Sequence, residues 1–541
     1  MNPITPRTHY VHGHVFTSHP EAPFAEAFTV CDGRIVAVGT TEEILAERDP
    51  ADLVEDLAGQ TVIPGIVDAH MHPQMLAEFT PQISALPPAI GSLADLAQAI
   101  QGQREAQGPG LWIQCWGYDE GKFSERRPPT RYDLDAGCSD SPVVAVRNCT
   151  HLYSVNSKAL EICGITRDTP DPEGGEIERD AAGEPTGILK ENAANLVMPF
   201  LPQPSHEDRI QWLLALGRLM AQQGLVAVAD MGIYSIDEFQ LYEQAADRGF
   251  AQELAGYFSW GALSQEPDFA ILPAWKDRDR QIRVAGLKLL GDGSFGGHTA
   301  WVDQAYLQDP TDFGIQVCSA ELLESAIVRA KEEGLQLSAH AMGGRSIAMM
   351  VDRISQETPW LSDALSQEGI PFARIEHVTE PRAESMEKAA RAGIAFVTQP
   401  IFFFSEVESY LLNLGSERLQ KTYPLQKMLE VGIDLALSTD APATAWATPS
   451  EPFITLQAAV TKRAYEGTDC GLAEKLDIQT AVRLYTREAA RVCGFEGLGM
   501  IQPGYKASFL ILSDDLFAVS PEAIGKVHPV ATYIRGEKVF G

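Results

Sequence analysis

Eight apolar runs of strand length alternate with helical sequence through the middle of the chain, and this alternation limits the possible folds more than any other feature. Helical periodicity lies between most of the runs, for example over 207–223 and 320–333. Eight repeats of strand and then helix predict an α/β fold of the (β/α)8 TIM-barrel type. A doubly wound open sheet is the alternative that the pattern leaves open. The eight runs are Thr61–Ala69, Leu225–Met231, Leu254–Trp260, Val284–Leu290, Leu335–His340, Ala373–His377, Gly393–Gln399 and Ile433–Asp440.

Both ends of the chain carry sequence typical of β-structure. Residues 25–39 alternate as two strands around Asp32 and Gly33, a dipeptide typical of hairpins. Near the C-terminus, 507–512 predicts a strand and 530–540 a second hairpin. Because β segments stand at both ends with α/β sequence between them, we predict one small β-sandwich domain closed by both termini.

The gap between the first and second apolar runs is far longer than a usual βα loop. Residues 80–205 fill it and contain strand-like segments of their own over 111–116 and 142–147. We interpret them as an inserted subdomain over the barrel mouth, where barrel enzymes build their active sites, and therefore as a lid and specificity element. The predicted domains are a composite β-sandwich of 1–62 and 500–541, a barrel of 63–499, and the inserted 80–205.

The balance of charges argues against two classes of partner. The chain has 541 residues and a net charge of −32, from 74 acidic and 42 basic residues, and such a field repels nucleic acid and anionic membrane surfaces. The chain has no run of about 18 apolar residues and no signal-peptide pattern, so we expect a cytoplasmic protein. The eight cysteines include no Cys-x-x-Cys pair and predict no disulfide framework. We expect a small-molecule substrate as the partner, and a homodimer stays open.

A His-x-His pair ends the first apolar run. His70 and His72 directly follow the apolar segment 62–69. Residues two apart on a strand face the same side, so both imidazoles can point into the barrel axis and share one metal. Zn²⁺ accepts histidine nitrogen at about 2.0–2.1 Å, which suits two ligands from one strand end. For this motif alone, a polar pair without a metal is the alternative.

Three further polar residues fall at the C-terminal ends of predicted barrel strands: His340, His377 and Asp440. Catalytic groups of barrel enzymes lie at this end, so together with the His-x-His pair these residues favour a metal centre. Once the barrel closes, its last strand lies beside its first, and Asp440 could ligate the same metal or accept a proton from metal-activated water. Taken singly, each histidine could be an ordinary buried one, and Asp440 could be a helix N-cap.

Lys288 is an unusual residue for its position, because it lies in the otherwise apolar run 284–290. Burial of an unpaired lysine is costly, so the side chain should either point outward or be chemically changed. A carbamate formed from its amine and CO₂ would be anionic and could bridge two metals. His298 lies in the βα loop that follows, at the same mouth of the barrel.

Taken together, these segments resemble the amidohydrolase superfamily, and within it the amidohydrolase 3 (YtcJ-like) group that includes N-substituted formamide deformylases. The resemblance covers nearly the whole chain, and no single segment carries it. It implies a β domain composed from both termini together with a barrel. The segments that carry it are 32–39, 62–72, 156–160, 183–189, 288–294, 340–343, 376–377, 438–442 and 504–507.

The resemblance also implies roles for individual residues. One or two divalent metals, with zinc expected, would be held by His70, His72 and Asp440 in a first position and by His340 and His377 in a second. Carboxylated Lys288 would bridge the two, and His151 in the insertion would contact the substrate.

The sequence departs from the family pattern at three places. Gly343 and Gly344 stand where the family often has Gly-Asp, His298 stands where it often has Arg, and Ala507 and Ser508 stand where it often has Ala-Asp. The first two departures lie near the predicted mouth and bear on substrate choice.

The expected reaction is hydrolysis of a non-peptide C–N bond, an amide or an N-formyl or N-acyl group, by metal-activated water. Asp440 would accept the proton of the water and return it to the leaving nitrogen, while His298 or His151 would stabilise the oxyanion. The same site could instead hydrolyse a cyclic amide, an ester or a lactone, or deaminate a substrate. A non-catalytic binding barrel is less favoured, because all six candidate metal ligands are present.

Overall fold

The computed structural model describes residues 7–148, 152–266 and 268–541. These residues divide into two compact units. The barrel unit comprises Met1–Pro73, Leu213–Thr444 and Ser450–Gly541, and the inserted unit comprises Gln74–Trp212 and Ala445–Pro449. The expectation that the insertion covers the barrel mouth stays a prediction.

The barrel unit is built on an eight-stranded sheet in which hydrogen-bonded neighbours are parallel and follow chain order. Two backbone hydrogen bonds join its ends, from Asp440 N to His70 O and from His72 N to Ala441 O, each 2.8 Å long. The sheet therefore closes on itself, which confirms the (β/α)8 barrel and excludes the open sheet. The strands are β8 (Ile66–Met71), β15 (Leu225–Ile233), β16 (Glu253–Ser259), β17 (Ile282–Leu290), β18 (Gln336–Ala341), β19 (Ala373–His377), β20 (Ile394–Thr398) and β21 (Leu435–Leu437).

The first predicted run, Thr61–Ala69, is two strands and not one. Its first half is β7 (Thr61–Pro64), which belongs to the terminal β-structure, and its second half begins barrel strand β8. Gly65 separates them at a close approach, because a Cβ there would lie 2.4 Å from Val226 Cγ1. A continuous apolar run does not reveal this change of sheet, since both halves are fully buried.

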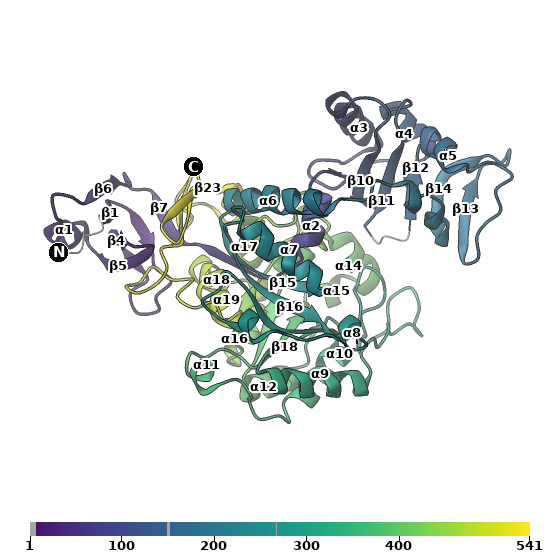
Figure 1. The fold of residues 1–541 in the computed structure, drawn as a ribbon. Coiled ribbons are helices and arrows are strands. Elements are labelled where there is room, and N and C mark those ends of the chain that lie inside the picture. Colours follow the sequence, from purple (N-terminus) through teal and green to yellow (C-terminus); the bar gives the residue numbers. More distant parts are fainter. Residues whose placement is uncertain (1–6, 149–151, 267) are drawn as a thin grey trace. The chain divides into compact units, whose positions relative to one another are not determined.

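The terminal segments form two further sheets, of which the first is N-terminal and the second combines both ends of the chain. The second of them pairs N-terminal β7 with C-terminal β22, and the purple strand β7 and the yellow strand β23 of this sheet are labelled in Figure 1. Aromatic rings from both ends share the core, where Tyr10 packs on Phe28 at 4.8 Å and on Phe509 at 5.1 Å between ring centroids. The sheet orders are β5-β4-β1-β6 and β24-β23-β22-β7-β2-β3, with β1 (Thr8–Val11), β2 (His14–Phe16), β3 (Phe24–Ala25), β4 (Ala27–Cys31), β5 (Arg34–Gly39), β6 (Leu53–Asp56), β22 (Phe509–Leu512), β23 (Pro529–Ile534) and β24 (Glu537–Phe540).

Both predicted hairpins form. In β4–β5 the turn residues Asp32 and Gly33 have φ of 48° and 71°, and in β23–β24 Arg535 and Gly536 have φ of 50° and 81°. Two consecutive left-handed residues are the signature of the two-residue turn whose twist matches antiparallel strands.

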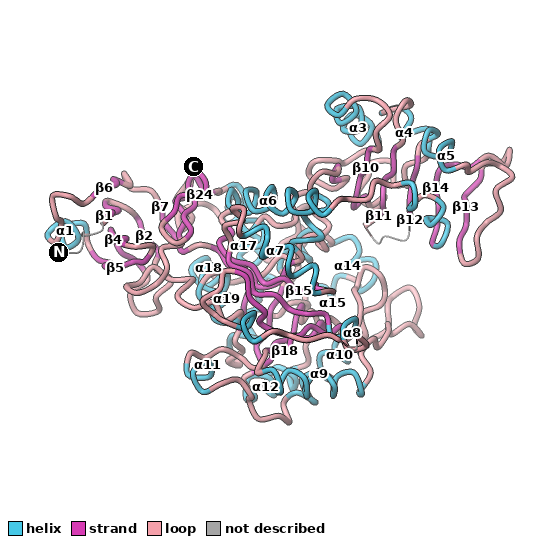
Figure 2. The backbone as a smooth tube through the Cα atoms, viewed as in Figure 1, coloured by secondary structure: helices cyan, strands magenta, loops and turns pink. Residues whose placement is uncertain are grey.

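Helices connect the barrel strands and cover the outside of the sheet, as the cyan helices around the magenta strands show in Figure 2. Helix α9 (Ala320–Glu333) illustrates why they form: it buries Leu323, Ala326, Ile327 and Ala330 along one face and begins at the N-cap Ser319. The others are α6 (His206–Gln223), which joins the two units, α7 (Ile236–Ala246), α8 (Trp260–Leu263), α10 (Gly344–Ile354), α11 (Asp363–Gln367), α12 (Ala383–Ala392), α13 (Pro400–Ser405), α14 (Val407–Leu414), α15 (Ser416–Leu419), α16 (Leu425–Glu430), α17 (Pro452–Thr461), α18 (Ile478–Tyr485) and α19 (Arg487–Val492), and α1 (Thr41–Ala46) lies in the terminal β-structure.

The inserted unit has its own sheet and its own core. Apolar side chains of two parallel strands pack with Leu96 and Ile100 of a long helix, so the unit buries hydrophobic surface without the barrel. The sheet order is β13-β14-β12-β11-β10-β9, with β9 (Ile83–Ser84), β10 (Ile113–Tyr118), β11 (Val143–Arg147), β12 (Leu152–Val155), β13 (Gly175–Arg179) and β14 (Pro185–Glu191), and the helices are α2 (Pro73–Phe79), α3 (Leu93–Gln107), α4 (Arg131–Gly137) and α5 (Ser157–Cys163).

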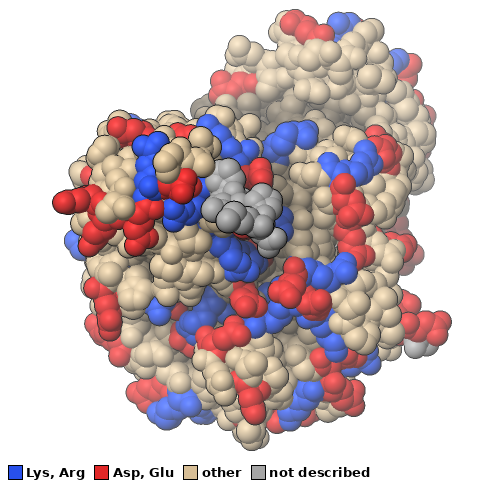
Figure 3. All heavy atoms as spheres, turned by 60° about the vertical axis from the view of Figure 1, so that its left-hand side comes forward, with Lys and Arg blue, Asp and Glu red and all other residues tan. Residues whose placement is uncertain are grey.

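Acidic and basic side chains are interspersed on the face of the molecule drawn in Figure 3. Surface ion pairs such as Arg382 with Asp303 and Arg278 with Glu368 show how basic residues are matched with part of the acidic excess. Within the described ranges, no helix combines the length and the apolar character needed to cross a membrane.

Candidate metal centre

The C-terminal ends of four barrel strands bring the predicted polar residues together. His70 lies in β8, His340 in β18 and His377 in β19, and Asp440 follows β21. The backbone of His377 and of Asp440 is left-handed, with φ of 72° and 58°. Such non-glycine conformations are strained and concentrate at functional positions, which fits a site at this end of the barrel.

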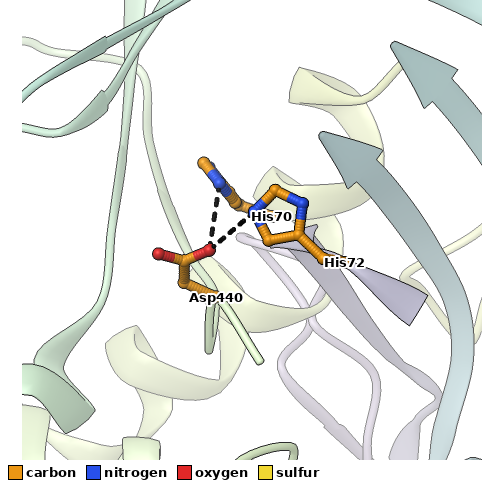
Figure 4. A group of neighbouring side chains, drawn as sticks. All are labelled: His70, His72 and Asp440. Atoms are coloured by element: carbon orange, nitrogen blue, oxygen red, sulfur yellow. Dashed lines mark ion pairs between the residues drawn. The ribbon is translucent and has the colours of Figure 1, made fainter. Parts of the chain in front are cut away.

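His70, His72 and Asp440 form a compact group of possible metal ligands. Asp440 Oδ1 lies 3.3 Å from His70 Nε2 and 3.1 Å from His72 Nε2, and one ligand atom from each residue lies within 4.8 Å of the others (Figure 4). Although burial alone would raise it, the neighbouring His70 and His72 hold the pKa of the Asp440 carboxyl well below its usual value. A carboxylate and two imidazoles converging on one point suit a divalent cation such as Zn²⁺.

Three buried polar atoms in this region support that fit. Within the described part of the chain, Asp440 Oδ1, His377 Nε2 and Lys288 Nζ have no hydrogen-bond partner. Buried polar atoms are almost always paired, so a cluster of such atoms at one strand end needs an explanation. For the two ligand-type atoms, a bound cation supplies one.

Glu376 orients the imidazole of His70. Its Oε2 accepts a hydrogen bond from His70 Nδ1 at 2.7 Å, which leaves Nε2 directed toward Asp440. The carboxylate also accepts hydrogen bonds from Ser338 Oγ at 2.8 Å and from Arg374 Nη2 at 3.0 Å. Burial alone would raise the pKa of Glu376, but Arg374 and His70 hold it well below its usual value, so the group is a carboxylate. Metal-binding histidines commonly have such a partner.

The role of Glu376 was not predicted, although its strand carries a signal for it. Arg374 and Glu376 alternate with Ile375 inside a fully buried strand, which indicates an inward-facing charged pair.

His340 and His377 form a second pair beside the first group. Their ring centroids are 4.2 Å apart, and the ring of His377 is 4.8 Å from that of His70. His377 Nδ1 donates to Gln399 Oε1 at 2.9 Å, and His340 Nε2 donates to Gly293 O at 2.9 Å. Each ring therefore keeps one nitrogen lone pair available. Burial lowers the pKa of both imidazoles, to about 4 for His340, so both are neutral near pH 7.

Lys288 is buried in β17, with strand neighbours Ser259 and Ser338. Burial lowers the pKa of its amine to about 8, while the negative charges of Glu376 and Asp440 act in the opposite direction. Lys288 therefore lies inside the barrel near the charged groups of the centre, and not on a polar outer face.

The two residues predicted to stabilise an oxyanion are His298 and His151. His151 falls outside the described residues. His298 Nε2 lies 2.7 Å from Asn413 Oδ1, its Nδ1 lies 3.5 Å from Asp312, and its ring stacks on Tyr306 at 4.7 Å. Its described contacts are thus with the loop and α14, and its role as a donor to the substrate stays a prediction.

Gly343 and Gly344, of which the second departs from the family pattern, have a packing role. A Cβ on Gly343 would lie 2.2 Å from Trp301 O, and one on Gly344 would lie 2.3 Å from Asp303 Oδ2. Asp292 fixes the same turn, because its carboxylate accepts hydrogen bonds from the backbone nitrogens of Trp301, Met342 and Gly343. Its Oδ1 lies 3.4 Å from His340 Nε2, so this buried aspartate also supports the second pair.

Comparison with known proteins extends over nearly the whole chain. Residues 53–540 match the family described as "Amidohydrolase family". The chain is 29% identical to the Bacillus subtilis (strain 168) protein named "Putative amidohydrolase YtcJ", covering 98% of both chains. It is 28% identical to the N-substituted formamide deformylase of Arthrobacter pascens, covering 95% of this chain and 94% of that one.

A solved structure shows the same fold. An uncharacterized metal-dependent hydrolase from Pyrococcus horikoshii OT3 superposes with a TM-score of 0.70 at 24% identity, covering 95% of this chain and 99% of that one. Because the family match includes the whole barrel, its metal-ligand group and the C-terminal strands β22, β23 and β24, the chain belongs to the amidohydrolase family of hydrolases.

Proposed function

We propose that this hydrolase cleaves a non-peptide C–N bond, in an N-formyl or other N-acyl amide of a small molecule. The observation that carries the proposal is the group of His70, His72 and Asp440 at the C-terminal end of the barrel. The similarity to a protein named N-substituted formamide deformylase supports the choice of bond.

The proposed cofactor is zinc, in one or two ions. His70, His72 and Asp440 would hold the first ion, and His340 and His377 the second. Lys288 would bridge them as a carbamate, formed when its neutral amine adds CO₂ and loses a proton; the lowered pKa of Lys288, about 8, increases the share of neutral amine. When bound, a divalent cation lowers the pKa of a water molecule and polarises a carbonyl group.

Asp440 is the proposed proton carrier. Its low pKa keeps it ionised at neutral pH, and its Oδ1 is free of hydrogen bonds within the described residues. The carboxylate can therefore accept the proton of the attacking water and return it to the leaving nitrogen. Glu376 and Gln399 keep the rings of His70 and His377 in the tautomers that this arrangement needs.

The test combines metal analysis with a substrate panel. Purified protein is analysed for bound metal and then assayed with N-formyl and N-acyl amines, with cyclic amides, esters and lactones, and with amino-substituted heterocycles for deamination. We expect release of a carboxylic acid and an amine from the first group. Asp440→Asn should abolish this turnover while much of the metal stays bound, and the exposed control Asp514→Asn should behave as wild type.

Two results would contradict the proposal. Turnover confined to the other groups would assign a different bond to the same centre, and full activity of Asp440→Asn would remove the proposed proton carrier.

A further inference from the structure

Tyr234 follows β15 at the same end of the barrel as the metal-centre residues. Its position is fixed by the start of α7: the Tyr234 backbone N donates to Glu238 Oε2 at 2.6 Å, and Glu238 N donates to Oγ of the N-cap Ser235 at 3.1 Å. The side chain therefore projects from an anchored strand-to-helix junction and not from a free loop.

The ring of Tyr234 is a neighbour of His72. A Cβ on Gly232 would lie 2.5 Å from His72 Nδ1 and 3.4 Å from Tyr234 Cε2. The imidazole of His72 and the phenol ring of Tyr234 thus both lie close to Gly232. A side chain at position 232 would occupy the space between them. Tyr234 lies two residues beyond Gly232, so extended geometry directs both to the same side of the chain.

The hydroxyl of Tyr234 is available for a ligand. Tyr234 is 47% exposed, and no hydrogen bond of its hydroxyl occurs among the described residues. By contrast, the hydroxyls of two buried tyrosines of the same unit are already used in hydrogen bonds. Tyr242 donates to Asp230 Oδ2 at 2.6 Å, and Tyr485 donates to Asp68 Oδ2 at 3.2 Å.

The charges around Tyr234 keep it a donor. Burial of part of the ring raises the pKa of its phenol, and the negative charges of Asp230, Glu238 and Asp440 raise it further. An ordinary tyrosine already titrates near 10, so at neutral pH the group is an O–H donor. The influence of Asp440 also indicates that the phenol lies within electrostatic reach of the metal centre.

We propose that Tyr234 is a catalytic residue that donates a hydrogen bond from its hydroxyl to the carbonyl oxygen of the substrate as negative charge develops there. This inference rests on the proposed amide hydrolysis. It assigns to Tyr234 the task first considered for His298, whose ring nitrogens face Asn413 and Asp312. A donor aimed at the developing oxyanion acts mainly in the transition state, so its effect should appear in kcat and not in KM.

The experiment compares Tyr234→Phe with wild type and with a control variant, Tyr505→Phe. Tyr505 lies shortly before β22, in the terminal β-structure. Metal content, kcat and KM are measured with the best N-formyl or N-acyl substrate from the panel. We expect Tyr234→Phe to lose on the order of 100-fold in kcat, with KM and bound metal little changed. Tyr505→Phe should match wild type. Wild-type kcat in Tyr234→Phe would overturn the inference.

A second measurement keeps this inference separate from the proposed function. If wild type hydrolyses no amide in the panel, the proposed function fails, and binding of methylphosphonate, a tetrahedral anion, to the metal-loaded protein is then followed by calorimetry. Loss of the phenol hydrogen bond should weaken binding about tenfold in Tyr234→Phe. Equal affinities for the two proteins would overturn the role of Tyr234.

Discussion

The two halves of the candidate metal centre are supported in different ways. In the first half, His70 is held by the carboxylate of Glu376, which is itself fixed by Arg374 and Ser338. In the second half, His377 is held by the neutral Gln399 amide, and His340 donates to a backbone carbonyl at 2.9 Å, with the Asp292 carboxylate farther away at 3.4 Å. A carboxylate partner makes an imidazole a stronger ligand than a neutral partner does. The first half should therefore bind a cation more tightly.

The difference also separates two tasks. The first half contains Asp440, the one carboxylate in the ligand group and the proposed proton carrier. The second half contributes neutral imidazoles beside a buried lysine. A centre of this kind could lose the second cation under mild chelation and still keep the residue that moves the proton.

The largest effect should come from removing a ligand of each half in turn. His70→Ala should abolish turnover and bound metal, because it removes a ligand from the half that holds the cation more tightly. His340→Ala should keep about one metal per chain and part of the activity. Elemental analysis of both variants beside kinetic assays checks this, and loss of all metal from His340→Ala alone would reverse the order of the two halves.

A smaller effect is expected from the partners of the histidines. Glu376→Gln should weaken binding of the first metal by about 10- to 100-fold. It should also lower the free energy of unfolding by about 3–5 kcal/mol, because Arg374 would be left as a buried cation without its carboxylate. Metal competition with a chromophoric chelator and urea unfolding measure the two effects. Gln399→Leu is the matched variant of the other half, and a greater loss there than in Glu376→Gln would contradict the comparison.

The smallest expected effect comes from a substitution that makes the metal affinities of the two halves more alike. Gln399→Glu gives His377 a carboxylate partner, and it should strengthen binding of the second metal by about tenfold or less. The same chelator titration should then show two metals released over a narrower range of chelator concentration than in wild type. A wider separation of the two steps would mean that the partners of the rings do not govern affinity.

Much of the fold could be predicted, because the periodicity of apolar residues and the length of apolar runs are strong signals of secondary structure. The eight runs correspond to the eight barrel strands, and the dipeptides at 32–33 and 535–536 form the expected turns. The change of sheet at Gly65 was not predicted, since two consecutive buried strands have the same apolar character as one. The hydrophobic pattern indicates that a strand is buried, but it does not indicate to which sheet the strand belongs.

The candidate site could be predicted in part for a similar reason. His70, His340, His377 and Asp440 stand at strand ends, and a closed parallel barrel brings strand ends together. The contribution of Tyr234 depends on the orientation of one side chain at a strand-to-helix junction, which no sequence period determines. One partner of His298, Asn413, also comes from α14, more than a hundred residues further along the chain.

The position of β7 has a consequence for synthesis of the protein. This strand pairs on one side with β2 and on the other with β22, which comes from the last part of the chain. During synthesis, β7 would therefore expose one unpaired edge, directly before barrel strand β8, until β22 emerged. Exposed edges of this kind promote association with other chains, so truncations at the C-terminus should aggregate during expression before they affect the chemistry of the barrel.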